Sequence, residues 1–144
     1  MRYRLTLILL AVPVLLHAQQ APPPPAPVHL DSVTWRGNGP LQSAVIDGDP
    51  SADGKPYTML LKLPAGFWIQ PHTHNVPKRI LVLRGELLVG HGEAIDTTGV
   101  QRLGVGDFLA MPAGHAHYEG GVGETVIALY GIGPLRTTFI NQRR

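Results

Sequence analysis

Glycine and proline interrupt this chain so often that long regular elements have little room to form. The 144 residues include 17 glycines and 14 prolines. The apolar, β-branched and aromatic segments between them are only about 4–8 residues long, the usual length of a β-strand. The pattern therefore predicts an all-β domain, either a sandwich or a barrel. Strands are expected at residues 57–63, 67–70, 79–83, 86–90, 107–111, 117–119, 124–130 and 137–140.

Histidines recur in two short stretches of the chain. The first stretch contains His72 and His74, and the second contains His115 and His117. Residues i and i+2 of a strand point to the same face, so His72 and His74 can direct two imidazoles at one point. His117 can supply a third imidazole from another strand. Because three neutral imidazoles commonly hold a divalent transition metal, we predict a metal site of His72, His74 and His117.

These stretches resemble the two conserved motifs of the cupin superfamily, G(X)5HXH(X)3–4E(X)6G and G(X)5PXG(X)2H(X)3N. The matching residues are Gly66, His72, His74 and Gly85 in the first motif, and Gly106, Pro112, Gly114 and His117 in the second. The resemblance runs from about residue 33 to residue 140. It implies a small, single-domain jelly-roll β-barrel with these histidines as ligands. It implies little about the reaction, because one fold hosts many chemistries.

Two positions depart from the family pattern. Lys78, or Arg79 on the longer spacing, stands where the family has its acidic ligand, and Gly121 stands in place of the final Asn. A lysine ammonium donates hydrogen bonds and cannot replace an oxygen ligand. Three arrangements are compatible with this change. Lys78 turns outward and leaves a three-histidine site; it pairs with Glu119, which becomes a partner or substitute ligand; or the metal is lost and a cationic pocket for a small anion remains.

Strand alternation predicts which residues surround the site. If His72 and His74 face the interior, Trp68 and Gln70 do so too, provided that no bulge intervenes near Pro71. His115 and Glu119 would share a face with His117. His115 is the best-placed candidate for a general base or for a partner that orients a ligand histidine. The expected pocket residues are Tyr57, Trp68, Gln70, Lys78, His115 and Glu119.

The predicted centre would leave two or three coordination positions open. That arrangement suits iron, manganese, nickel or copper, or zinc acting as a Lewis acid. We therefore expect a small metalloenzyme, oxygenase-like or isomerase-like, that acts on a small organic molecule. Two alternatives remain open: a non-catalytic binding barrel for a small anionic or hydrophobic ligand, and an interaction domain in which the histidines are relics. Motifs for phosphate cradling, dinucleotide binding or a serine nucleophile are absent from the sequence.

The first 18 residues have the pattern of a secretory signal peptide. Arg2 and Arg4 precede a mostly apolar run that ends at Leu16, and Ala18 is a small residue suited to cleavage. The run is too short to span a bilayer, which takes roughly 20 residues. We expect cleavage after Ala18 and export to the periplasm or the medium. Residues 19–32 are proline-rich and predict an extended linker, which leaves residues 33–144 as the barrel domain.

Charge and cysteine content limit the kinds of partner and of chemistry that we expect. Without Arg2 and Arg4, the 12 basic residues become 10, equal to the 10 acidic residues. The absence of a basic run speaks against nucleic acid as a partner, and the absence of cysteine excludes disulfides and thiol catalysis. A small molecule is the expected ligand or substrate. The family resemblance also implies a homodimer, because small cupins commonly pair through strand edges.

Overall fold

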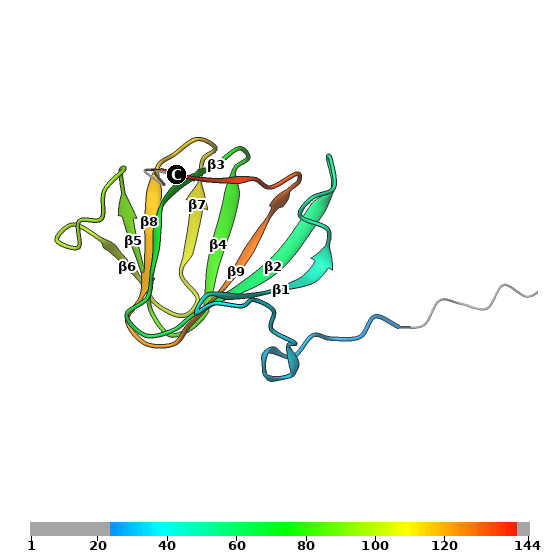
Figure 1. Cartoon of the computed structure of the whole chain (residues 1–144). Helices are drawn as coiled ribbons and strands as arrows, with labels where there is room; N and C mark the ends of the chain where they lie inside the picture. Colours follow the sequence, from blue (N-terminus) through cyan, green and yellow to red (C-terminus); the bar gives the residue numbers. More distant parts are fainter. Residues whose placement is uncertain (1–23, 141–144) are drawn as a thin grey trace, which may run out of the picture.

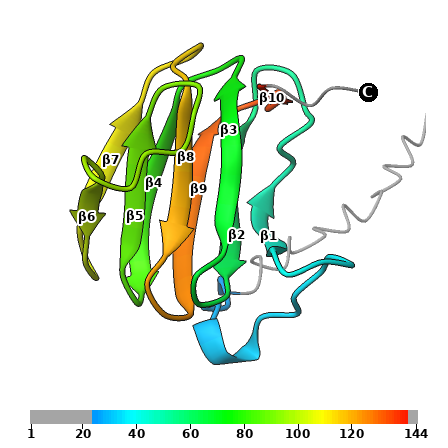
Figure 2. The same ribbon diagram turned by 60° about the vertical axis from the view of Figure 1, so that its left-hand side comes forward.

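The structure is a computed structural model that describes residues 24–140. Two antiparallel sheets of five strands each face one another (Figure 1). In Figure 2 the sheet that contains β3, β8 and β5 lies in front of the sheet that contains β4 and β9. This confirms the predicted all-β jelly-roll barrel. The predicted signal peptide, residues 1–18, lies outside the described residues, as does the beginning of the predicted linker.

The order of the strands in each sheet decides which residues can meet. One sheet has the order β1-β2-β9-β4-β7 and the other has the order β10-β3-β8-β5-β6. The first sheet contains β1 (Gln42–Gly48), β2 (Pro56–Leu63), β4 (Lys78–Arg84), β7 (Phe108–Met111) and β9 (Thr125–Ile132). The second contains β3 (Trp68–His74), β5 (Leu87–His91), β6 (Gln101–Leu103), β8 (His117–Gly121) and β10 (Thr137–Phe139). Within the described part of the chain, no helix is long and apolar enough to cross a membrane.

Two strands, β1 and β6, are absent from the expected set. Both lie at sheet edges, where one side of the strand has no neighbouring strand. In both strands polar residues break up the apolar ones. β1 carries Ser43 and Asp47, and the short β6 carries Gln101 and Arg102. A hydrophobic pattern therefore cannot identify them.

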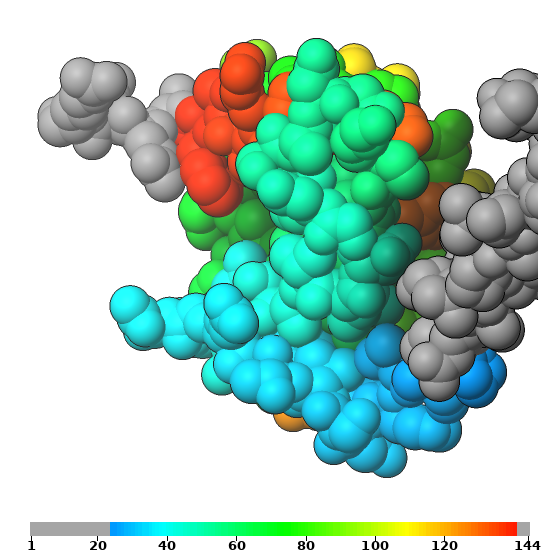
Figure 3. All heavy atoms as spheres, turned by 90° about the vertical axis from the view of Figure 1, so that its right-hand side faces the viewer, coloured from blue at the N-terminus to red at the C-terminus, as the bar shows by residue number. Residues whose placement is uncertain are grey.

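The segment before β1 contacts the barrel. Residues 30–32 form a 3-10 turn, and Asp31 pairs with Arg84 at 2.7 Å. Figure 3 shows this segment, in blue, lying across the lower end of the barrel, while β10, in red, lies at the upper end. The end of the predicted linker is therefore in contact with the barrel.

Apolar side chains from both sheets fill the space between them. The buried cluster consists of Leu63, Ile69, Ile80, Val82, Leu87, Val89, Leu103, Met111, Ile127 and Leu129. On β3, Ile69 belongs to this cluster and the histidines follow it. On β4, Lys78 comes before Ile80 and Val82. The polar residues therefore occupy one end of the barrel interior, next to a dry core that holds their strands in place.

Candidate metal centre

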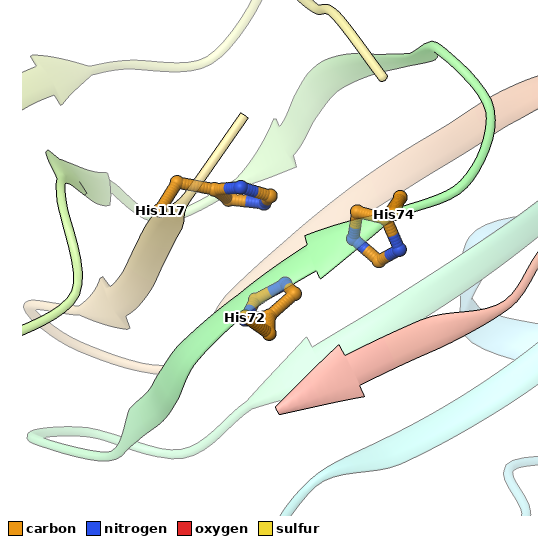
Figure 4. Close-up of side chains that lie close together, drawn as sticks. All are labelled: His72, His74 and His117. Carbon is orange, nitrogen blue, oxygen red and sulfur yellow. The ribbon is translucent and has the colours of Figure 1, made fainter. Parts of the chain in front are cut away.

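Two adjacent strands bring the three histidines together. His72 and His74 lie near the end of β3, and His117 is the first residue of β8. The β3–β8 register places His72 directly opposite His117, and their ring centroids are 4.3 Å apart. Figure 4 shows the three rings directed toward one another. All three side chains are buried, so the arrangement predicted from the i, i+2 spacing is present in the folded chain.

Hydrogen bonds on one side of each ring hold the Nε2 atoms inward. His72 Nδ1–H donates to the Gln70 carbonyl at 2.7 Å, and His117 Nδ1–H donates to the His115 carbonyl at 2.9 Å. His74 Nδ1 lies 3.1 Å from the Thr137 hydroxyl of β10. A carbonyl partner on Nδ1 fixes the tautomer that leaves a lone pair on Nε2.

The three inward nitrogens lie close to one another and are poorly satisfied by the protein. One ligand atom from each of His72, His74 and His117 lies within 4.8 Å of the other two. The Nε2 atoms of His74 and His117 are buried and have no hydrogen-bond partner among residues 24–140. A buried polar atom without a partner costs roughly 1–3 kcal/mol, so this convergence is unfavourable unless something binds there.

Burial also keeps these imidazoles neutral. Desolvation, with a further effect of the Lys78 charge and the other two histidines, lowers the pKa of His74 to about 3. Desolvation likewise lowers the pKa of His117 to about 4 and lowers that of His72. Neutral imidazole is the form that ligates metals, so the histidines are ready to bind at neutral pH without losing a proton.

An ion pair crosses the barrel beside the histidines. Lys78 Nζ, from β4 of one sheet, lies 3.1 Å from Glu119 Oε1, from β8 of the other. The two side chains are 1% and 0% exposed. Burial alone would raise the pKa of Glu119, but the Lys78 ammonium, His117 and His72 together outweigh burial and hold that pKa below its usual range. Of the three arrangements considered for Lys78, the structure shows the pairing with Glu119, and the outward orientation is wrong.

Glu119 also lies within reach of the histidines. Its Oε2 is 3.9 Å from His72 Nε2, and its Oε1 is 3.8 Å from His117 Nε2. Oε2 is buried and has no hydrogen-bond partner in the described part of the chain. The polar end of the interior therefore holds three neutral imidazoles, one carboxylate and one ammonium.

A cavity of about 180 Å³ opens beside this polar cluster. Its polar lining comes from His72, His74, Lys78, Glu119 and Thr137. The remainder is apolar and comprises Leu41, Met59, Leu61, Ile69, Leu129, Leu135 and Phe139. Phe139 and Thr137 belong to β10, which pairs with β3 next to the histidines. Strand 137–140 was predicted, but its place beside the site was not, because no local sequence pattern specifies which strands pair.

Gln70 and Trp68 do not line this cavity, contrary to expectation. Between Ile69 and His72, β3 has one more residue than the opposite segment of β8, so the register shifts. This irregularity, at Pro71, turns Gln70 outward, and its side chain is exposed. Trp68 lies opposite Gly120, and a β-carbon at Gly120 would lie 2.7 Å from the Trp68 ring. Proline suits an irregular strand position because it has no N–H to donate.

His115 and Tyr57 were also expected in the pocket and lie outside the cavity. The His115 ring is exposed and hydrogen-bonds to His91, with Nε2 and Nδ1 2.9 Å apart. The backbone carbonyl of His115, not its ring, orients His117. Tyr57 is buried beside Gly131, the strand partner of Lys78, and lines a separate hollow.

A larger hollow of about 460 Å³ lies between β1 and the segment before it. Arg36 is the one ionisable side chain among its lining residues, Val28, Ser32, Val33, Thr34, Arg36, Ala44, Val45 and Ile46. The convergence of buried polar groups, not size, therefore identifies the cavity at the histidines as the functional site.

Comparison with known proteins places this fold in context. The Cupin family model matches residues 57–140. Germin-like protein subfamily T member 3 of Arabidopsis thaliana is 39% identical over 61 residues, which are 42% of this chain and 27% of that protein. The match thus spans about a quarter of the length of this curated relative.

Three solved structures share the fold at low sequence identity. A cupin superfamily protein of Desulfitobacterium hafniense is 19% identical, with a TM-score of 0.58 over 76% of this chain and 93% of its own. DMSP lyase DddQ of Ruegeria pomeroyi is 19% identical, with a TM-score of 0.60 over 76% and 61%. Salicylate 1,2-dioxygenase of Pseudoaminobacter salicylatoxidans is 14% identical, with a TM-score of 0.59 over 72% and 30%. Because the family model covers more than half of the residues and the barrel has the family's fold, this chain belongs to the cupin family.

Proposed function

We propose that His72, His74 and His117 bind a divalent transition metal through their Nε2 atoms, and that this centre acts on a small, largely apolar organic molecule. One observation carries the proposal: the Nε2 atoms of His74 and His117 are buried, converge with His72, and have no partner in the described part of the chain. A bound cation would satisfy these nitrogens together.

The residues fit such an ion in chemistry and in spacing. Metal–imidazole bonds are about 2.1 Å long, so two nitrogens on a tetrahedral ion lie roughly 3.4 Å apart. The three nitrogens of the structure lie within 4.8 Å of one another, and an inward rotation of the rings would bring them onto one ion. The carbonyl partners of His72 and His117 already hold the required tautomer. Imidazole ligands suit zinc, copper, iron and nickel.

The chain's own residues favour a small and mostly apolar substrate. The cavity of about 180 Å³ is smaller than the roughly 300–1,000 Å³ of pockets for drug-sized ligands. Its apolar wall, which includes Met59, Leu129 and Phe139, would surround the part of a molecule that faces away from the histidines. The polar end orients one oxygen-bearing group. A bound metal would supply Lewis acidity or redox chemistry at that end.

The relatives support a catalytic function without defining the reaction. One structure with this fold is a lyase and another is a dioxygenase. At 19% and 14% identity they share the fold alone, so oxygenase-like, lyase-like and isomerase-like reactions remain candidates for this chain.

A second candidate is a non-catalytic barrel that binds a small hydrophobic ligand. The predominantly apolar wall of the cavity favours it. The anionic form of this alternative has less support, because the Lys78 ammonium is already paired with Glu119 and that carboxylate would repel an anion. Substrate-dependent turnover by the metal-loaded protein separates catalysis from simple binding.

Metal analysis and calorimetry test the proposed centre. Protein purified without an affinity tag should contain a transition metal at up to one equivalent, or take up one equivalent of Mn²⁺, Fe²⁺ or Zn²⁺ in titration. His74→Ala should abolish that binding. His91→Ala is the matched control, because His91 is exposed and pairs with His115 outside the cavity. Equal affinity in wild type and His74→Ala would contradict the proposal.

A further inference from the structure

The carboxylate that the family pattern places at position 78 has a counterpart on a different strand in this chain. We propose that Glu119 is a fourth protein ligand of the metal through Oε2, and that Lys78 positions this carboxylate by holding Oε1. This inference rests on the proposed metal site. Position 119 is not a ligand position in either cupin motif, so the role of Glu119 is inferred from its geometry at the site.

Strand geometry directs Glu119 toward the histidines. It lies two residues after His117 on β8, so the two side chains share the inner face. Its register partner on β3 is Ile69, a core residue, which confirms the inward direction. The side chain is 0% exposed, so its carboxylate is directed at interior groups.

The distances are close to those between ligands of a common ion. Glu119 Oε2 lies 3.9 Å from His72 Nε2, and Oε1 lies 3.8 Å from His117 Nε2. Both values are about half an ångström longer than the roughly 3.4 Å between two ligand atoms with bonds of about 2.1 Å on a tetrahedral ion. The three histidines form the group of ligand atoms that lie within 4.8 Å of one another, and a small movement of Glu119 would bring its carboxylate to an ion held by His72 and His117.

The two oxygens of Glu119 have different environments. Oε1 accepts a hydrogen bond from Lys78 Nζ at 3.1 Å. Oε2 is buried without a partner among the described residues. Ligating carboxylates usually receive a hydrogen bond on the oxygen that does not bind the metal, and this fixes their orientation. Lys78 makes that contact from the opposite sheet, so it acts on the metal through Glu119 and needs no lone pair of its own.

Substitutions at Glu119 test the ligand role directly. Glu119→Gln keeps an acceptor for Lys78 but removes the anionic oxygen, and Glu119→Asp keeps the charge but withdraws it by one methylene. We expect at least a tenfold loss of Co²⁺ affinity in each, and a changed Co²⁺ visible absorption spectrum. Glu124→Gln is the control, because Glu124 is an exposed partner of Arg84. Circular dichroism establishes that each variant is folded before titration.

Epistasis tests the positioning role of Lys78. Lys78→Met should change the Co²⁺ spectrum of the wild type, because the released carboxylate can bind through both oxygens. In the Glu119→Gln background the same change should leave the Co²⁺ spectrum unchanged, because no carboxylate remains to be released. An equal spectral change on Lys78→Met in both backgrounds would overturn the positioning role.

The outcomes distinguish this inference from the metal site itself. If wild type binds Co²⁺, His74→Ala does not, and both Glu119 variants match wild type in affinity and spectrum, the inference is wrong and the three-histidine site stands. If wild type binds none of Co²⁺, Mn²⁺, Fe²⁺ and Zn²⁺, the proposed metal site fails and the inference fails with it.

Discussion

Removing Lys78 from the barrel interior should strongly destabilise the metal-free protein. The substitution Lys78→Met keeps an unbranched side chain of similar length and removes the ammonium, with both its charge and its hydrogen bond to Glu119. It leaves the Glu119 carboxylate, which is 0% exposed, without its cation. The nearest remaining groups are His72 and His117, whose lowered pKa values keep them neutral at pH 8. Glu119 would therefore remain buried without a compensating charge.

The structure sets the size of the effect. Two unit charges 3.1 Å apart interact by about 5 kcal/mol at an effective dielectric constant of 20. Breaking a buried pair by removing one partner costs about 3–5 kcal/mol. For a domain of this size, each kcal/mol lowers Tm by roughly 4 °C or somewhat more, so we expect a fall of at least about 12 °C.

A double-mutant cycle isolates the pair. We expect Lys78→Met and Glu119→Leu each to lower the free energy of unfolding. The double variant should lose less than either single variant, because a buried pair replaced by apolar groups is often neutral or stabilising. Urea denaturation at pH 8 in the presence of a chelator gives the four free energies.

Lowering the pH provides an internal check on the cause. In Lys78→Met, Glu119 loses the cation that most strongly opposes the effect of burial, so its pKa should be raised. A raised acid pKa means that the folded state binds the proton first, so the stability deficit should shrink as the pH falls from 8 toward 5. A deficit below about 1 kcal/mol at pH 8, or additive single effects, would refute the buried-pair argument.

Four other predictions follow from the same site and from the sequence. Lys78→Glu, which restores the family's acidic residue, should tighten divalent-metal binding by roughly ten- to a thousandfold in calorimetry, where each tenfold is about 1.4 kcal/mol. Unchanged affinity would show that the ammonium has no electrostatic effect on the ion. Because the pKa of His74 is lowered from 6.5 to about 3, the unfolded chain binds this proton first, and the free energy of unfolding should fall between those pH values by up to about 1.4 kcal/mol per pH unit. His74→Ala should show a shallower fall in metal-free denaturation curves, and identical slopes would argue against the shift. The mature protein is expected to begin near Gln19 in the periplasm or medium, which mass spectrometry of those fractions checks; a full-length chain found only in the cytoplasm would contradict export. A homodimer is expected in light scattering at micromolar concentration, and a monomeric mass would contradict it.

Local patterns in the sequence were sufficient for the fold class and for the histidine triad. Frequent Gly and Pro limit the length of each element, and the period of two along a strand places His72 and His74 on one side. Both properties depend on residues a few positions apart, whereas His117 joined the set through the spacing of the second cupin motif. The edge strands β1 and β6 were not predicted, because their sequences show little regular alternation of apolar and polar residues.

The tertiary structure decided the remaining features of the site. A single extra residue in β3 near Pro71 turned Gln70 away from the cavity, and nothing in the local sequence specifies where a register shift falls. Lys78 and Glu119 meet across two sheets although they are 41 residues apart in the chain. The amino-acid sequence therefore determined which residues share a face within one regular stretch of strand, because strand alternation is local. Which of those groups touch depends on sheet pairing and sheet packing, which join distant segments, and only the folded chain shows it.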